Sequence, residues 1–279
     1  MEKLTVSPIK GGIGIEITHA DLTRPAADTI AAIRRVYDDN PIVVLRDQTI
    51  PVDSYVAFGK GLGELLPHTR LEYTVPGHPE VYVLTNKKKE DGTMLGVHLD
   101  GLGWHSDGTY LQRPLAATLL HALEVPPEGG DTIFADTCAA YENLSEEMKV
   151  KVEDMVVVYD FVFYMQTRFP DYQITDKQRA ENPEVRHRLV QRSPTGRPGL
   201  YMSNGSARGI DGMTDEDGRA FLRELTQFVT RPEHVYRHHW QPGDIVIWNN
   251  LQTMHTATLY DDTRYERLLH RLWIQAEVT

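Results

Sequence analysis

The stretch "QPGDIVIWNNLQTMH", residues 241–255, decides the fold class of this chain. Its first four residues are typical of a turn, and the apolar run "IVIWNN" that follows, rich in β-branched side chains, predicts a short strand. His255 comes a few residues after this strand, where we expect the mouth of a loop. Short strands bounded by turn residues are therefore the units to look for along the rest of the chain.

Similar strands and a smaller number of amphipathic helices are predicted elsewhere. The predicted strands cover residues 41–47, 80–86, 115–126 and 267–276. The predicted helices cover residues 30–39, 51–66, 145–155 and 214–229, the last two beginning at the capping residues Ser145 and Thr214. Because the strands do not alternate regularly with helices, a doubly wound parallel sheet is disfavoured. The pattern predicts a mainly β fold, a sandwich or jelly roll with flanking helices packed outside.

The composition is that of an ordinary soluble globular protein. The chain has 279 residues, of which 41% are hydrophobic and 25% charged, and we expect residues 1–279 to form a single domain. The single cysteine, Cys138, excludes a disulfide framework and is predicted to be a small buried apolar side chain. The N-terminal segment lacks an apolar run of signal-peptide length, and no stretch could span a bilayer, so we expect a cytoplasmic protein.

The net charge narrows the choice of partners. A formal charge of −11 disfavours nucleic acid, and the short basic run at residues 87–89 is predicted to be a solvated part of the long loop 87–104. A small anionic substrate remains compatible with this charge, provided that the chain supplies cations locally. A homodimer or homotetramer is also compatible with the sequence.

A histidine and an aspartate two residues apart stand out in "GLGWHSDGTY", residues 101–110. At a strand end, His105 and Asp107 would leave the same face, with Cα atoms roughly 6–7 Å apart. His255 is the candidate for a third ligand. Two histidines and one carboxylate can bind Fe(II) on one face, but zinc also accepts such a set, and a polar pair without metal is the plain alternative.

Four segments in order give this pair a wider context. "WHSDGTY", "PPEGGDTIFADTCAAYENL", "QPGDIVIWNNLQTMH" and "RLLHR" resemble the TauD/TfdA family of iron(II)- and 2-oxoglutarate-dependent dioxygenases, and the resemblance runs over essentially the whole chain. The resemblance implies a double-stranded β-helix, or jelly roll. It also implies that His105, Asp107 and His255 are the metal and catalytic residues, with Fe(II) as the metal and 2-oxoglutarate and O₂ as co-substrates.

The same resemblance implies roles for residues outside the metal site. Arg267 would bind the far carboxylate of 2-oxoglutarate, helped by Thr132, because a guanidinium binds a carboxylate with two parallel hydrogen bonds. The spacing from His255 is one residue longer than in taurine dioxygenase, which leaves Arg264 as a second candidate. Arg271, four residues after Arg267 on the same face of a strand, would bind the substrate's carboxylate or sulfonate. His68 lies near a second family position that touches the substrate anion.

The reaction implied is oxidation, by hydroxylation, of a small carboxylate- or sulfonate-bearing molecule, coupled to conversion of 2-oxoglutarate and O₂ to succinate and CO₂. Desaturation or cyclisation in a biosynthetic pathway uses the same machinery and stays open. Asp107 argues against halogenation, because related halogenases have a small residue in its place. A catalytically silent jelly-roll binding protein and a zinc hydrolase are the alternatives from other classes.

The remaining histidines and acids receive plainer interpretations. His98 and Asp100, in the loop before the metal motif, could line the pocket, but solvent exposure is the prediction for each. His121 lies in an apolar strand and is predicted to be a hydrogen-bonded core residue. His238 and His239 are adjacent, so only one of them can point inward from a strand.

Overall fold

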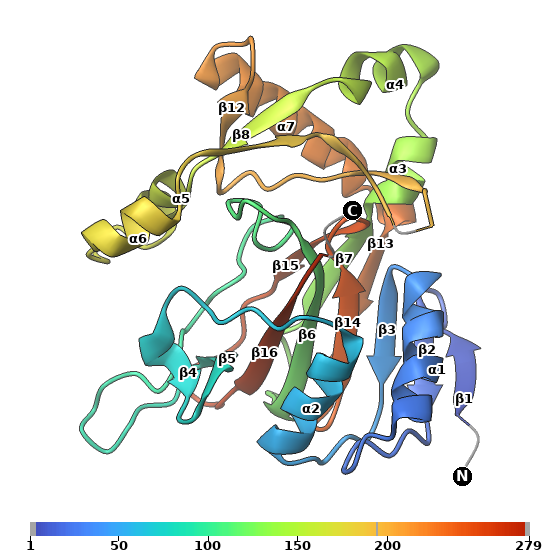
Figure 1. The fold of residues 1–279 in the computed structure, drawn as a ribbon, viewed down its shortest axis with the longest axis vertical. Coiled ribbons are helices and arrows are strands. Elements are labelled where there is room, and N and C mark those ends of the chain that lie inside the picture. Colours follow the sequence, from blue (N-terminus) through green and yellow to red (C-terminus); the bar gives the residue numbers. More distant parts are fainter. Residues whose placement is uncertain (1–3, 194, 277–279) are drawn as a thin grey trace.

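An eight-stranded sheet forms the centre of the computed structural model, which describes residues 4–193 and 195–276 (Figure 1). Across the sheet the strands are β1 (Thr5–Pro8), β2 (Ile15–Thr18), β3 (Ile42–Leu45), β14 (Ile245–Asn249), β6 (Leu115–Glu124), β16 (Leu268–Gln275), β5 (His78–Thr85) and β4 (Thr74–Val75). All neighbouring strands are antiparallel except β2 and β3. In the centre of the sheet, from β3 to β5, neighbouring strands come from distant parts of the chain, as in a jelly roll.

A smaller antiparallel sheet faces the large one. It consists of β13 (Val235–His238), β7 (Thr132–Asp136) and β15 (Thr253–Ala257), with β7 in the middle. Phe134 of β7 packs edge-on against Trp248 of β14, with ring centroids 5.3 Å apart. The space between the two sheets is thus filled by side chains from both.

The strand of the opening motif, β14, is buried on both of its faces. Ile245 and Ile247 belong to one apolar cluster, with residues of the N-terminal helices, whereas Val246 and Trp248 belong to a second cluster, with Phe134. Alternate residues of a strand point to opposite faces, and here each face meets an apolar layer. This explains why the sequence shows a continuous apolar run rather than an alternating one.

Two N-terminal helices cover the outer face of the large sheet (Figure 1). They are α1 (Ala27–Asp38) and α2 (Val52–Leu62). α1 begins three residues before the predicted helix, and α2 ends before the predicted residue 66 because Gly63 leaves the helical region. Tyr55 of α2 donates its hydroxyl to the backbone carbonyl of Leu119 in β6, which fixes the helix to the sheet.

The remaining helices and short strands form a layer at one end of the sheets. Its members are α3 (Thr137–Glu142), α4 (Glu146–Glu153), β8 (Val156–Tyr159), α5 (Phe161–Arg168), α6 (Asp176–Glu181), β9 (Val185–Arg188), β10 (Val190–Arg192), β11 (Pro198–Leu200), β12 (Ala207–Ile210) and α7 (Asp215–Val229). The described residues also form two short 3-10 helices, η1 (Leu71–Tyr73) and η2 (Pro232–His234). Figure 1 shows α5, α6, β8, β12 and α7 together above the sheets.

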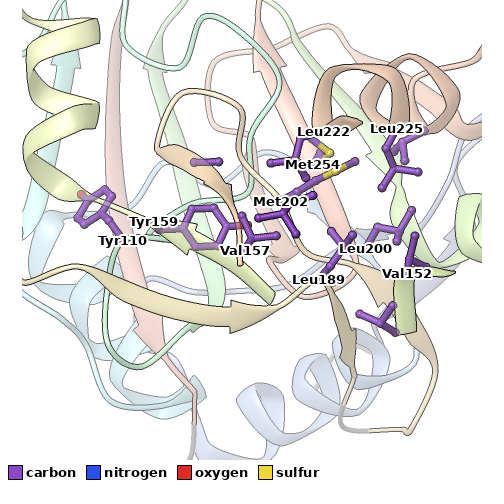
Figure 2. Packing of buried hydrophobic residues seen from close by; sticks show 14 of the residues in the cluster. Tyr110, Val152, Val157, Tyr159, Leu189, Leu200, Met202, Leu222, Leu225 and Met254 are labelled. Carbon is purple, nitrogen blue, oxygen red and sulfur yellow. The ribbon is translucent and has the colours of Figure 1, made fainter. Parts of the chain in front are cut away.

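An apolar cluster joins this layer to the small sheet. Figure 2 shows Leu222 and Leu225 of α7 packing toward Met202 and Met254, all in the buried interior. Met254 lies on β15 directly before His255, so its burial in the cluster turns the next side chain to the opposite face.

The predicted fold class is confirmed: the protein is mainly β, with flanking helices and the two facing sheets of a jelly roll. His121 is buried and bonds the Gln48 carbonyl at 2.7 Å, as predicted for a core histidine. His238 is buried while His239 is exposed, and Cys138 is buried. In the residues that the structure describes, no helix combines the length and the apolar character needed to cross a membrane.

Candidate active site

Two histidines far apart in the sequence are held opposite each other by their own backbones. The N–H of His105 donates to the carbonyl of His255 at 3.0 Å, and the N–H of His255 donates to the carbonyl of His105 at 2.8 Å. This reciprocal pair extends along the loop, since Ala257 donates to the carbonyl of Gly101. Residues that exchange both hydrogen bonds present their side chains on the same face, and the two imidazole rings lie 4.2 Å apart.

Asp107 completes a cluster with these two histidines. Its Oδ1 lies 3.7 Å from Nε2 of His105, and its Oδ2 lies 3.7 Å from Nε2 of His255. One nitrogen or oxygen atom from each of the three side chains lies within 4.8 Å of the other two. Asp107 is 4% exposed, so the carboxylate is shielded from bulk water.

Polar residues behind Asp107 fix its orientation. The hydroxyl of Thr118, in the middle of β6, donates to Oδ2 at 2.7 Å, and that hydroxyl accepts a hydrogen bond from the side-chain amide of Asn250 at 2.9 Å. The Asn250 side-chain oxygen accepts from the backbone N–H of Asp107 at 3.2 Å. All three residues are buried, so the carboxylate has one well-defined position.

The protonation states suit metal binding. Nδ1 of His105 lies 2.7 Å from the carbonyl of Gly103, which can only accept, so Nδ1 carries a proton and Nε2 is the nitrogen that could bind a metal ion. Burial, with the neighbouring His105, lowers the pKa of His255 to about 3. Burial alone would raise the pKa of Asp107, but His255, Arg271 and the Thr118 hydroxyl together hold it below its ordinary value.

The donor set therefore fits a divalent metal ion. Two imidazoles and one carboxylate converge without forming hydrogen bonds to one another, because their 3.7 Å separations are too long. Ligands about 2.1 Å from a shared ion are themselves roughly 3 to 4 Å apart. A set of two histidines and one carboxylate leaves coordination positions open for other ligands.

Arg267 lies in the segment just before β16. Its Nη2 donates to the carbonyl of Gly130 at 3.1 Å, and its Nε is buried and has no hydrogen-bond partner among the described residues. Within the described part of the chain, no carboxylate lies within 4.0 Å of Arg267. Burial lowers the pKa of Arg267 to about 10, which still leaves the group charged at neutral pH. A guanidinium in this state has hydrogen bonds to offer to an incoming carboxylate.

Thr132 lies on the same inner face of the small sheet as His255. Thr132 is opposite Ala257 and Phe134 is opposite His255 in the pairing of β7 with β15, and residues two apart share a face. Its hydroxyl oxygen accepts a hydrogen bond from the indole N–H of Trp240 at 3.1 Å, so its own O–H remains free to donate.

A cavity of about 330 Å³ opens beside His105 and Asp107. Aromatic rings form much of its wall, namely Trp104, Tyr110, Tyr164 and Trp273. A smaller space of about 20 Å³, which Arg267 lines, adjoins it, because Asp100 and Leu102 border both.

Arg271 and His68 meet in the wall of the larger cavity. Nη2 of Arg271 lies 3.1 Å from Nε2 of His68, and Nη1 lies 3.6 Å from Oδ2 of Asp100. The backbone N–H of Arg70 donates to Nδ1 of His68 at 3.1 Å. Burial, together with Arg271 and Arg70, holds the pKa of His68 well below its ordinary value, so the ring is neutral.

Comparison with known proteins decides the family. The sequence model described as "Taurine catabolism dioxygenase TauD, TfdA family" matches residues 5–273. Pentalenolactone F synthase of Streptomyces arenae is 32% identical over 274 residues, which cover 92% of this chain and 91% of the relative. The chain belongs to the TauD/TfdA family. The predicted family and the predicted enzyme class, a 2-oxoglutarate-dependent dioxygenase, are thereby confirmed.

Other TauD/TfdA relatives differ in substrate. Alpha-ketoglutarate-dependent 2,4-dichlorophenoxyacetate dioxygenase of Cupriavidus pinatubonensis is 28% identical, over 92% of this chain and 93% of the relative. Alpha-ketoglutarate-dependent sulfate ester dioxygenase of Pseudomonas putida is 29% identical, over 99% and 91%. The solved structure of AAD-2 with Mn(II) and N-oxalylglycine superposes with a TM-score of 0.80 at 28% identity, covering 99% of this chain and 98% of that one.

The structure brings most of the residues predicted from the TauD/TfdA resemblance to one place. His105, Asp107 and His255 form one cluster, and His68 and Arg271 line the cavity beside it. The two alternative arginines for 2-oxoglutarate differ: Arg267 is largely buried in the adjoining space, whereas Arg264 is exposed and lies over the ring of Tyr265.

The prediction of solvent exposure was wrong for Asp100. Its side chain is only 6% exposed, because its Oδ2 lies 3.6 Å from Nη1 of Arg271 and its Oδ1 accepts the backbone N–H of Gly101. His98 is partly exposed and lies 3.0 Å from Asp262, in the wall of the smaller space.

Sequence reasoning missed several residues of this site. Thr118 and Asn250, which orient Asp107, were not singled out, although a threonine within the apolar run "LAATLLHALE" was a usable signal. Arg70 was also missed, and its only signal was its place two residues after His68.

Proposed function

We propose that this protein uses Fe(II), 2-oxoglutarate and O₂ to hydroxylate a small molecule that carries a carboxylate, sulfonate or sulfate group. The observation that carries the proposal is the convergence of His105, Asp107 and His255 beside a cavity whose wall contains Arg271 and His68. Residues 1–279 act as one catalytic domain in this proposal.

The chain's own residues hold the metal and the co-substrate. His105, Asp107 and His255 would bind Fe(II), which supplies the activation of O₂ when it is bound. Arg267 would take the far carboxylate of 2-oxoglutarate, and the free hydroxyl proton of Thr132 would donate to the same group. The buried position of Arg267 and its unpartnered Nε support this assignment over Arg264.

The contact between Arg271 and His68 supports an anionic substrate. Nδ1 of His68 accepts from the backbone of Arg70, so the proton of this neutral ring is on Nε2. That N–H then faces the guanidinium of Arg271 at 3.1 Å, which is also only a donor. Two donors that point toward each other need a shared acceptor, and an oxyanion of the substrate would provide it.

Besides an anionic group, the substrate needs an apolar body that fits the aromatic wall of the cavity. Rings of Trp104, Tyr110 and Tyr164 border the cavity and would exclude water from the reacting part of the molecule. The cavity volume of about 330 Å³ is at the small end of the range for ligand sites, ~300–1,000 Å³. The substrate is therefore a compact acid with an apolar body.

A biosynthetic desaturation or cyclisation is the second candidate outcome. It is favoured by one observation, the 32% identity to pentalenolactone F synthase. The position of the substrate's carbon atoms, rather than the metal ligands, would decide between these outcomes and hydroxylation.

Succinate formation tests the proposed function. The Fe(II)-loaded protein is incubated with 2-oxoglutarate, O₂ and a panel of small acids, and succinate is measured with and without each acid. We expect Asp107→Ala to abolish turnover of 2-oxoglutarate while the protein stays folded. Succinate formation by pure Asp107→Ala protein would contradict the ligand assignment, and activity restored by zinc but not by iron would support a hydrolase.

A further inference from the structure

A second buried guanidinium lies in the same cavity, and the site described above does not use it. Arg70 lines the cavity and is only 4% exposed. Its guanidinium carbon lies 4.3 Å from the centroid of the Phe169 ring, 5.5 Å from those of Tyr73 and Tyr82, and 6.0 Å from that of Tyr172. Cation–π contacts of this kind hold the side chain in place.

Arg70 differs from Arg271 in its charge partners. Arg271 lies 3.6 Å from Asp100 and 3.9 Å from Asp107. Arg70 has no carboxylate within 4.0 Å and no acceptor for its guanidinium N–H groups, judged over residues 4–193 and 195–276. Burial would lower the pKa of Arg70, but Tyr82 and the more distant Asp100 hold it above its ordinary value, so the group is charged, and its N–H groups still need hydrogen-bond acceptors.

Other donors in this region point to the same need. In the part of the chain that the structure describes, the hydroxyl of Tyr82 and the indole N–H of Trp273 are buried and have no hydrogen-bond partner. Arg168, at the end of α5, also lines the cavity, and its guanidinium donates to the backbone carbonyl of Leu99. The cavity therefore offers more hydrogen-bond donors and positive charge than the Arg271 site alone can account for.

We propose that the preferred substrate carries two acidic groups, one bound by Arg271 and His68 and the other by Arg70. Both arginines line the same cavity, and their guanidinium carbons lie 4.8 and 5.5 Å from the centre of the same Tyr82 ring, which limits the distance between them to about 10 Å. The inference rests on the proposed function, because it concerns the substrate of the same site.

Matched probes separate the second charge from size and shape. Phenoxyacetate, 4-carbamoylphenoxyacetate and 4-carboxyphenoxyacetate have a common body, and the last two differ mainly in the charge of the second group. Hexanoate and adipate form an aliphatic pair. Each is titrated calorimetrically into protein saturated with Mn(II) and N-oxalylglycine, which keeps the 2-oxoglutarate site filled. Substrate-dependent succinate formation is measured in parallel with Fe(II) and 2-oxoglutarate.

In the unaltered protein we expect a diacid of at least one series to bind about tenfold or more tightly than its singly charged partner, as a charge-assisted contact allows. Arg70→Met keeps the apolar stem against the aromatic rings but removes the charge, so it should abolish this preference. It should change binding of the monoacid less than about twofold. Arg70→Lys should restore part of the preference.

Arg186→Met, at an exposed position of β9, is the matched control and should leave every affinity unchanged. The inference is overturned if neither diacid is preferred, or if Arg70→Met weakens monoacid and diacid alike. The second result would place the only substrate anion on Arg70 or give that residue a structural role. Failure of the proposed function would appear separately, as a loaded protein that does not bind or turn over 2-oxoglutarate.

Discussion

Thr118 supports the metal site through Asp107 without being a metal ligand itself. Its hydroxyl connects Asn250 to Asp107, and Thr118→Val removes that hydroxyl with little change of volume. We expect metal affinity to fall roughly 10–100-fold, the usual effect of losing a hydrogen bond behind a ligand. Mn(II) titration followed by electron paramagnetic resonance measures this.

Thr137→Val is the control for this change, because the buried Thr137 hydroxyl makes no hydrogen bond to any residue that the structure describes. Its metal affinity should match that of the unaltered protein. Equal affinities for Thr118→Val and the unaltered protein would show that the hydroxyl does not orient Asp107.

The two candidate arginines for 2-oxoglutarate give a paired test. Arg267→Gln removes a partly buried guanidinium that lines the smaller space, whereas Arg264→Gln removes an exposed one. We expect the first change to raise the Kd for 2-oxoglutarate by about 100-fold, since a two-pronged charged contact is lost, and the second to leave it unchanged. Titration of the metal-loaded protein with 2-oxoglutarate under anaerobic conditions measures both, and the reverse ranking would move the role to Arg264.

Some residues of the site could be predicted from a short sequence motif, whereas others are placed by irregular segments and could not. His105 and Asp107 are two apart in the sequence, so their spacing alone marks them as a candidate pair, although in the structure His105 forms only an isolated bridge and Asp107 lies in a turn rather than on a strand. Arg70 and Asp100 reach the cavity through a 3-10 turn and a long loop, whose paths no periodicity encodes. The exposure of Asp100 was therefore predicted wrongly.

At the scale of elements, α7 shows what its N-terminal cap contributes. The Thr214 hydroxyl accepts a hydrogen bond from the N–H of Asp217, and three acidic residues occupy the first turn. Thr214→Ala should lower the free energy of unfolding by about 1 kcal/mol, as loss of a helix cap does. Urea unfolding measures the change, and Thr214→Ser should restore most of it. An unchanged free energy of unfolding in Thr214→Ala would mean that this cap does not stabilise the protein.

Elements with a strong local signal were predicted, and those without one were not. The helix that begins at Thr214 has both a cap and an apolar stripe, and β14 has turn residues before it. α5 has the sequence "FVFYMQTR", which is apolar on every side in its first half, so no helical face stands out. Its cap, Asp160, was the one usable signal.

Across the whole molecule, the positions of the charged residues decide substrate binding more than the net charge does. The chain carries a formal charge of −11, yet Arg70, Arg168 and Arg271 line one cavity. An acidic surface repels small acids at long range, so binding depends on these local cations, which act at short distance and are less screened by salt than surface charges. Net charge alone therefore does not predict the charge of the substrate.

Buried histidines should make the stability of the whole protein depend on pH. His121 and His270 are opposite each other in β6 and β16; burial lowers the pKa of His121, and burial together with His121 lowers that of His270 to about 4. Above pH ~6.5 these rings are neutral in both the folded and the unfolded chain. Below pH ~6.5 these histidines bind protons in the unfolded chain but not in the folded chain. The free energy of unfolding therefore falls as the pH drops toward 4.

The expected loss is up to about 1.4 kcal/mol per pH unit for each such histidine. Urea unfolding at pH 7.5 and 5.5, in EDTA so that metal ligands do not contribute through bound ion, measures it. His270→Gln removes one titrating group and should reduce the difference between the two pH values by about 1 kcal/mol, whereas His19→Asn, at an exposed position with positive φ that asparagine tolerates, should not. If the free energy of unfolding changes between pH 7.5 and 5.5 by the same amount in His270→Gln and in the unaltered protein, His270 binds its proton equally well in the folded and the unfolded chain.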